Sequence, residues 1–294
     1  MRIDLHTHSD RSDGTDSPAE LVRLARDTGV DVLALTDHDT TEGWDEAADV
    51  AERSGVALVR GIEVSARFAG SGVHLLAYLP DPGHPGLVAE LGRVLDGRNS
   101  RLPAVIDKLQ GLGIDIEADD VRRIAGDAAA LGRPHVADAL VAKGVVADRD
   151  EAFARFLGPR GPAYVDRYAA DLPTMIRTVT DAGGVSVIAH PWASRHDHEA
   201  LDEAGLASLQ ADGLAGLEVD HQDHSPEVRD ELRGIAGNLG LVTTGSSDYH
   251  GAGKLDHDLA CNTTAPDQLD RLLALAADAS ARSGRDTPAV VGRP

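Results

Sequence analysis

The chain has 294 residues, of which 42% are hydrophobic and 26% are charged, so its composition excludes collagen-like, coiled-coil and wholly disordered proteins. This length suits two average domains or one α/β barrel of about 250 residues. There are 28 Lys and Arg residues against 49 Asp and Glu residues, and the formal net charge is −21. Because such a surface repels polyanions, we expect no binding of duplex DNA.

The cysteine content and the N-terminal sequence predict where the protein resides. Cys261 is the single cysteine, so the chain forms no internal disulfide and no cysteine-based zinc site. The first residues, MRIDLHTHSD, lack the apolar region of a signal peptide. No run approaches the roughly 18 apolar residues of a membrane span. We therefore expect a soluble cytoplasmic protein with no membrane partner.

Short runs rich in Val, Ile and Leu alternate with helical patterns, which is typical of βαβ units and a parallel sheet. Ser17-Pro18-Ala19-Glu20 is a capping box with proline at the first helical position, and Gly29 ends the helix that it begins. Further helices are expected over 43–53, 172–182, 226–237 and 266–277. Seven strands are expected, over 2–8, 31–37, 56–62, 73–79, 184–190, 215–220 and 241–247.

Roughly 100 residues separate the fourth expected strand from the fifth, far more than the dozen that one crossover requires. Residues 81–170 carry helical periodicity instead of strand runs. We therefore predict an α/β barrel made of residues 1–80 and 171–279. Residues 81–170 are expected to form an inserted helical subdomain over one end of the barrel, which we call the lid. Residues 280–294 are expected to be a poorly ordered tail.

Potential metal ligands recur near the ends of the expected strands. His6 and His8 end the first strand on one face of the sheet, because side chains alternate along a strand. This pair alone is weak evidence, since a single histidine at a strand end is more often structural. Further donors follow near other strand ends, namely Asp13, His38, Glu63, His74, His190, Asp248 and His250. Imidazole and carboxylate without thiolate suit Zn, Mn or Fe, and barrel enzymes place their active sites at the C-terminal strand ends.

These motifs resemble the PHP (polymerase and histidinol phosphatase) family of metal-dependent phosphoesterases. The resemblance rests on LHTHSDRSDG, LTDHDT, GIEVS, VHLLAY, IAHP and GSSDYHG, which together span nearly the whole chain. It implies a distorted (βα)7 TIM-like barrel, in agreement with the seven strands expected independently. Relatives often carry histidine where this chain has Asp13.

The family resemblance also implies two or three divalent ions (Mn, Zn or Fe). A first ion would be held by His6, His8, Glu63 and Asp248, a second by Asp13, His38 and His250, and a third by Glu63, His74 and His190. Ions about 3.5–4 Å apart can bind a bridging hydroxide that attacks phosphorus. The expected catalytic group is such a metal-bound hydroxide, held by His6, His8, Asp13, His38, Glu63 and Asp248. Asp37 and Asp39 are expected either to orient imidazoles or only to cap the following turn.

Within the family, GRPHVA, GPAYVDR and LEVDHQDHSPE resemble a subgroup that acts on nucleotides. Its members remove the 3′-phosphate of adenosine 3′,5′-bisphosphate, and some also trim short RNA from a 5′-monophosphate end. The resemblance implies substrate contacts from Arg133, His135, His221 and His224. Arg98 and Arg101 share a helix face and would bind a second phosphate or lie in solvent, and Arg195 would bind an anion or lie in a solvated loop. We expect surface positions for His84, His196, His198 and His257.

We therefore expect a metal-dependent phosphatase that converts a nucleoside 3′,5′-bisphosphate to the 5′-monophosphate, with 5′–3′ exoribonuclease activity on short RNA as a second activity. The expected partners are an adenosine 3′,5′-bisphosphate or AMP-like nucleotide and short RNA. One alternative is a histidinol-phosphate phosphatase, which needs only one phosphate site. Another is an inert, metal-stabilised structural or regulatory module, although such barrels usually lose ligands.

Overall fold

The computed structural model describes residues 1–192 and 200–292, so Arg195, His196 and His198 lie outside the described residues. The strands are β1 (Ile3–Thr7), β2 (Val32–Leu35), β3 (Ala57–Phe68), β4 (Ser71–Tyr78), β5 (Ala170–Asp171), β6 (Val185–Ile188), β7 (Gly216–Asp220) and β8 (Val242–Gly245). The α-helices are α1 (Pro18–Asp27), α2 (Trp44–Ser54), α3 (Pro85–Gly111), α4 (Ala118–Ala125), α5 (Arg133–Ala142), α6 (Arg149–Ala152), α7 (Leu172–Asp181), α8 (Glu203–Ala211), α9 (Pro226–Leu239) and α10 (Pro266–Ser283). A π-helix, η1 (Phe153–Leu157), and a 3₁₀-helix, η2 (Gly251–Gly253), complete them.

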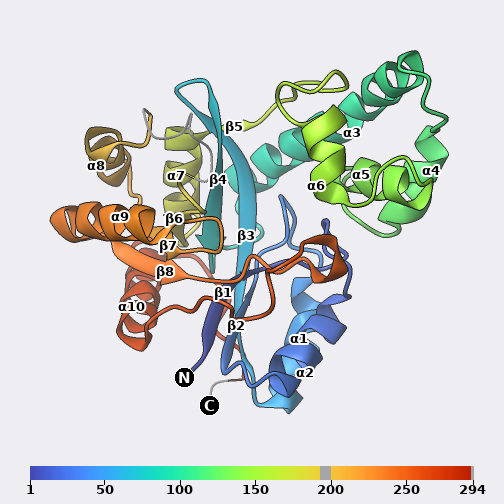
Figure 1. The fold of residues 1–294 in the computed structure, drawn as a ribbon. Coiled ribbons are helices and arrows are strands. Elements are labelled where there is room, and N and C mark those ends of the chain that lie inside the picture. The colour runs from blue at the N-terminus through green and yellow to red at the C-terminus, as the bar shows by residue number, and fades with distance from the viewer. Residues whose placement is uncertain (193–199, 293–294) are drawn as a thin grey trace.

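The sheet curls into a nearly closed barrel (Figure 1). Its order is β1-β2-β3-β4-β6-β7-β8, with the two-residue β5 paired to β3 off this path. The two strands at the ends of this order approach each other where Thr7 bridges Tyr249. The expected distorted (βα)7 barrel is therefore confirmed, and the carboxyl ends of its parallel strands meet at one rim.

The expectation of a parallel sheet is wrong at β4, which runs antiparallel to both β3 and β6. Its connection to β3 is a hairpin in which only Ala69 and Gly70 lie between the strands, and a two-residue turn can join only antiparallel strands. Both residues have positive φ, 47° and 88°, as expected for a type I′ turn that follows the sheet twist. As a result β3 extends six residues beyond the expected end at 62, to Phe68.

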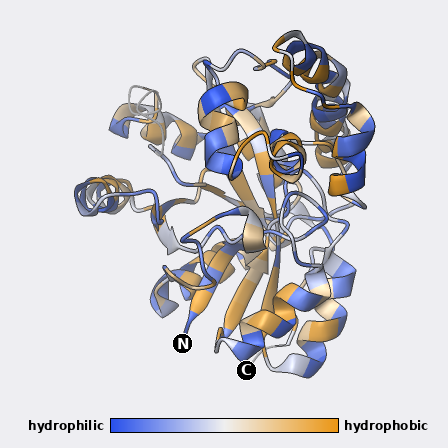
Figure 2. Cartoon of the chain, turned by 45° about the vertical axis from the view of Figure 1, so that its right-hand side comes forward, coloured by the Kyte–Doolittle hydropathy of each residue, from blue (hydrophilic) through white to orange (hydrophobic). Residues whose placement is uncertain are grey.

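Alternate residues of the strands pack into two separate hydrophobic clusters. Leu33 and Leu35 of β2 belong to a cluster with residues of α1, α2, α7, α8 and α9, whereas Val32 and Ala34 belong to a second cluster with α10. The Tyr78 hydroxyl donates a 2.8 Å hydrogen bond to the Leu5 carbonyl, which joins β4 to the non-adjacent β1 across the barrel interior. Figure 2 shows predominantly hydrophobic strands and helices with alternating hydrophobic and hydrophilic stripes, as expected for amphipathic helices around a buried sheet.

The helices α3 to α6 gather beside β3, on the right of Figure 1. The first half of α3 packs Leu87 and Val94 into the larger cluster that contains the barrel strands. Its second half packs Leu102 and Leu109 into a third cluster with α4, α5 and α6. One continuous 27-residue helix therefore joins the two cores, and this geometry fixes where the lid stands relative to the barrel.

The C-terminal segment differs from the expected poorly ordered tail. Helix α10 continues to Ser283, and Val291 pairs with Leu58 through two backbone hydrogen bonds of 2.8 and 3.1 Å. Arg285 also forms a 2.8 Å ion pair with Asp81. These contacts bind the segment to the barrel as far as residue 292. Among the described residues, no helix is both long and apolar enough to cross a membrane.

Candidate metal centre

Four imidazole and carboxylate side chains meet at the barrel rim with the spacing of a tetrahedral site. His6 Nε2 and His8 Nε2 lie 3.0 Å apart. Glu63 Oε2 lies 3.2 and 3.1 Å from these two nitrogens, and Asp248 Oδ1 lies 3.4 and 3.3 Å from them. Ligands about 2.05 Å from a tetrahedral ion are separated by roughly 3.3 Å. The donor set therefore fits a divalent ion.

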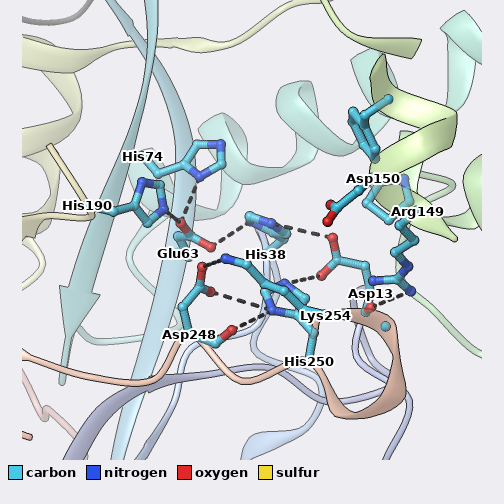
Figure 3. A pocket seen from close by; sticks show the side chains of 13 residues that line it. Asp13, His38, Glu63, His74, Arg149, Asp150, His190, Asp248, His250 and Lys254 are labelled. Carbon is cyan, nitrogen blue, oxygen red and sulfur yellow. Dashed lines mark hydrogen bonds and ion pairs between the residues drawn. The ribbon is translucent and has the colours of Figure 1, made fainter. Parts of the chain in front are cut away.

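A second set adjoins the first (Figure 3). Asp13 places Oδ1 3.3 Å from His250 Nε2 and Oδ2 3.6 Å from His38 Nε2. His8, Asp13, His38 and His250 offer ligand atoms that all lie within 4.8 Å of one another. Asp13 therefore serves this arrangement from the loop after β1.

Glu63 connects these donors to a third group. Its Oε1 lies 2.7 Å from His74 Nδ1 and 3.1 Å from His190 Nε2, while its Oε2 faces the first set. Figure 3 shows His74 of β4 and His190, which follows β6, pointing at the same carboxylate. All nine potential ligands identified in the sequence thus converge on one site.

Burial and charge keep the carboxylates of this centre ionised. Burial alone would raise the pKa of Glu63, Asp13 and Asp248, but the surrounding histidines, and Lys254 at Asp248, hold each pKa well below its usual range. Burial lowers the pKa of His38 to about 3, so its ring is neutral and can bind an ion. The buried Asp248 Oδ1 and His38 Nδ1 also have no hydrogen-bond partner. Ionised carboxylates and neutral imidazoles are the forms that metal binding requires.

Several ligands have strained backbones, as do residues beside them. Asp248 and His190 have φ values of 52° and 27°, and Asp39, beside His38, has 59°. Residues other than glycine seldom adopt positive φ, and the cost is of order 1–3 kcal/mol each. The fold accepts this strain where loops turn the side chains into the rim.

Glu218, which the sequence analysis missed, holds two ligands from β7. Its Oε1 lies 3.1 Å from His6 Nδ1, and its Oε2 accepts a 2.7 Å hydrogen bond from the backbone N–H of His190. The side chain is fully buried. A carboxylate on the far nitrogen of a metal-ligating histidine fixes the ring and raises its basicity. The only sequence signal is an acidic residue inside the buried strand GLEVD.

Asp248 is oriented in a similar way. Its Oδ2 lies 3.4 Å from His221 Nε2 and 2.5 Å from Lys254 Nζ, which leaves Oδ1 facing His6 and His8. The sequence analysis also missed Lys254. Its place six residues beyond Asp248, on the loop that carries His250, was the available signal.

In the described part of the chain, Asp37 and Asp39 accept no hydrogen bond from an imidazole, so the first of their two expected roles is not supported. Asp37 accepts hydrogen bonds from Ser9 and Ser12, and Asp39 accepts them from the N–H and hydroxyl of Ser65. Serine donors at short range satisfy both carboxylates. Their role is to fix the loops that carry the ligands.

Four arginines gather beside the centre, three of which were predicted as substrate contacts. Arg98 donates to Asp39 Oδ2 at 2.7 Å and to Ser65 Oγ at 2.8 Å, so it does not lie in solvent. Arg133 donates to the Leu157 carbonyl, and Arg167 donates to Ser65. Burial, followed by the charges of Arg133, Arg167 and Arg98, lowers the pKa of Arg101 to about 9. The four guanidinium groups therefore lie together, and Asp39 interacts with Arg98 and Arg167 among them.

The remaining predicted contacts lie elsewhere. His135 accepts a 2.9 Å hydrogen bond from the Gly132 N–H and is buried beside the loop of Asp13. His221 and His224 are 0% and 4% exposed and do not line the pocket over the metal ligands. The expectation that these two contact substrate is therefore not supported by their burial. His257 is also buried instead of lying on the surface.

The pocket above the ligands holds about 260 Å³ and opens between the barrel rim and the lid. Its wall combines metal ligands with Arg149 and Phe153 of the lid and Lys254 of the last rim loop. This volume suits a small molecule.

Comparison with known proteins agrees with this geometry. The PHP domain family matches residues 4–109. A 5′–3′ exoribonuclease of Haemophilus influenzae is 36% identical over 85% of this chain and 90% of its own length. A 3′,5′-nucleoside bisphosphate phosphatase of Chromobacterium violaceum is 35% identical over 87% of this chain and 90% of its own.

Two solved structures share the fold. A Bifidobacterium adolescentis protein assigned to the metal-dependent phosphoesterases superposes with a TM-score of 0.88 at 36% identity, covering 93% of this chain and 96% of its own. An amidohydrolase from Chromobacterium violaceum, with bound sulfate and no metal, superposes with a TM-score of 0.83 at 33% identity and covers 92% and 97% of the two chains. The converging ligands, the barrel and these relatives lead to one conclusion: the chain belongs to the PHP family of metal-dependent phosphoesterases and is a hydrolytic enzyme.

Proposed function

We propose that the enzyme hydrolyses the 3′-phosphate of a nucleoside 3′,5′-bisphosphate. The observation that carries the proposal is the arginine group, Arg98, Arg101, Arg133 and Arg167, placed next to the metal ligands. A small cavity lined by Asp13, His38 and Arg98 lies where the metal ligands meet the arginine group. A substrate with two phosphates matches a site with a metal centre and a neighbouring cationic pocket.

The metal centre is proposed to use the three ligand groups described above, with two or three divalent ions of Mn, Zn or Fe. Such ions would polarise the phosphoryl oxygens and lower the pKa of a bound water. The chain itself orients the ligands through Glu218, His221 and Lys254. Among the described residues, the pocket wall contains no Ser, Thr or Cys that could act as a nucleophile.

The second phosphate is proposed to bind mainly through Arg101. In the described part of the chain no hydrogen bond or ion pair engages its guanidinium, although its side chain is only 7% exposed. An anion there would relieve the mutual repulsion of the four guanidinium groups, and arginine matches phosphate geometry with paired donors. Arg133 sits over the rings of Phe153 and Tyr164, each 5.4 Å from the guanidinium carbon, which holds it in place.

Trimming of short RNA from a 5′-monophosphate end is a second candidate activity, favoured by the similarity to the Haemophilus influenzae exoribonuclease. The same arginine pocket would then bind the terminal 5′-phosphate. The expectation of a histidinol-phosphate phosphatase is not favoured, because these sequence relatives are named for nucleotide and RNA substrates. The complete ligand set argues against the inert module.

The test is phosphate or nucleotide release with four substrates: adenosine 3′,5′-bisphosphate, AMP, histidinol phosphate and a 5′-phosphorylated trinucleotide. We expect the bisphosphate to have the highest kcat/KM. Arg101→Met should raise its KM by about 10- to 100-fold, because a charged hydrogen bond contributes about 1.5–3 kcal/mol. The control is Arg123→Met, which removes an exposed arginine of α4. Histidinol phosphate as the best substrate, or an unchanged KM in Arg101→Met, would refute the proposal.

A further inference from the structure

The lid contacts three consecutive residues of the loop that carries Asp13, here called the Asp13 loop (residues 8–16). The Ala129 N–H donates to the Arg11 carbonyl at 2.9 Å. His135 lies beside Ser12, and both line one small cavity. Arg149 Nη2 donates to the Asp13 carbonyl at 3.1 Å. One lid surface therefore follows the backbone of this loop up to the metal ligand itself.

Arg149 is itself firmly held. Its Nε and Nη2 donate to the two carboxylate oxygens of Asp138 at 2.7 and 2.6 Å, so the lid helix α5 fixes the plane of the guanidinium. On another side it packs on Gly253, where an added Cβ would overlap the guanidinium. Figure 3 shows Arg149 reaching from the lid toward Asp13, with Lys254 and His250 on the neighbouring loop. The guanidinium thus contacts the lid and two rim loops that carry metal ligands.

From the barrel side, the Asp13 loop is held on both sides of Asp13. Before Asp13, Ser9 and Ser12 donate to Asp37. After it, the Ala252 N–H donates to the Thr15 hydroxyl at 3.0 Å, and the Tyr249 hydroxyl donates to Asp16 at 2.6 Å. The hydrogen bond to the Asp13 carbonyl comes from Arg149 of the lid. Arg149 therefore adds a lid contact at Asp13 itself, between the points where the barrel holds the loop.

We propose that Arg149 is a positioning residue that couples the lid to the metal ligand Asp13, so that ion binding by the Asp13 group and docking of the lid stabilise each other. This inference rests on the proposed metal centre. Coupling between two binding events is reciprocal, so any factor by which the docked lid tightens ion binding equals the factor by which the ion favours docking. Loss of a partner that orients a metal ligand typically weakens metal binding by about 10- to 100-fold.

The experiment measures Mn²⁺ affinity by calorimetry and hydrogen exchange of the lid segment 133–157 with and without Mn²⁺. In the wild-type protein, Mn²⁺ should slow exchange of this segment. Arg149→Met should weaken the Mn²⁺ affinity at one site by about tenfold and reduce the Mn²⁺ effect on exchange by a matching factor. Arg149→Lys should restore part of both, since a lysine can still reach one acceptor. Arg155→Met, which removes an exposed arginine of the same lid, is the matched control.

The outcomes separate the inference from the proposed function. If Mn²⁺ binds and Arg149→Met keeps both the wild-type affinity and the exchange response, the coupling is overturned while the metal centre stands. If the wild-type protein binds no divalent ion, both are overturned. Equal losses in Arg149→Met and Arg155→Met would also overturn the role of Arg149, because the effect would then be a general loosening of the lid.

Discussion

Replacing Glu218 by glutamine tests whether this buried carboxylate orients the metal ligands. The exchange preserves size and shape and replaces one oxygen by an NH₂ group. In the wild-type protein Oε1 faces His6 Nδ1 and accepts from the Ser246 hydroxyl, and Oε2 accepts from the His190 N–H. All three partners present donors when His6 binds an ion through Nε2. Whichever way the amide turns, its NH₂ group therefore faces at least one donor.

The magnitude follows from that mismatch. A buried donor left without an acceptor costs about 1–3 kcal/mol, so the metal-free variant should lose about that much stability. His6 also loses the negative charge that raises its basicity. Altering such a partner of a metal-ligating histidine weakens metal binding by about 10- to 100-fold, or about 1.4–2.8 kcal/mol.

The assay is Mn²⁺ titration by calorimetry, together with thermal unfolding of the metal-free protein. Glu231→Gln is the matched control, because Glu231 is an exposed acid on α9 and makes the same change in charge. We expect Glu231→Gln to behave as the wild-type protein. If Glu218→Gln binds Mn²⁺ as tightly as Glu231→Gln does, Glu218 does not orient the centre and the reasoning fails.

Three further predictions concern the metal and the Asp13 loop. Hydrogen bonds to Asp248 and Glu63 outweigh burial and raise the pKa of His8 to about 9, so the ring is protonated in the metal-free protein at pH 7. An ion must displace that proton, and the charges of Glu63, Asp248 and Glu218 also raise the pKa of His6, so Mn²⁺ affinity should rise at least about tenfold per pH unit below pH 9. Calorimetric heats that are equal in buffers of different ionisation enthalpy would contradict this. Removal of the ions by a chelator should lower the melting temperature, because an ion at 100 times its Kd contributes about 2.7 kcal/mol to the stability of the folded protein. Readdition of the ions should restore the melting temperature. An unchanged melting curve would exclude a stabilising ion. In Gly14→Ala the new Cβ would lie 2.6 Å from the His8 carbonyl oxygen, so the Asp13 loop must shift. Elemental analysis should then find one bound ion fewer than in the wild-type protein. The control Gly92→Ala, which has open space around its Cβ, should bind the full number of ions.

The sequence alone determined the family, the barrel and the set of potential ligands. It did so because the carboxyl ends of barrel strands meet at one rim, so donors placed at successive strand ends must converge. His6, His38 and Asp248 could be identified one by one from short motifs, without knowledge of any contact between them. The proline and capping-box signals also placed α1 within a residue of its observed start.

Only the tertiary structure showed which residues orient the metal ligands at the rim and which arginines lie together. Glu218 lies 212 residues from His6, and a contact across that separation leaves no local pattern in the chain. The same holds for Arg149 beside Asp13, 136 residues apart, and for the grouping of Arg98 with Arg101, Arg133 and Arg167. The antiparallel β4 was missed because a two-residue turn reverses the chain without altering the hydrophobic pattern of its strands. Local sequence specifies the kind of side chain and its strand, whereas the partner of each buried charge is set by packing between distant segments.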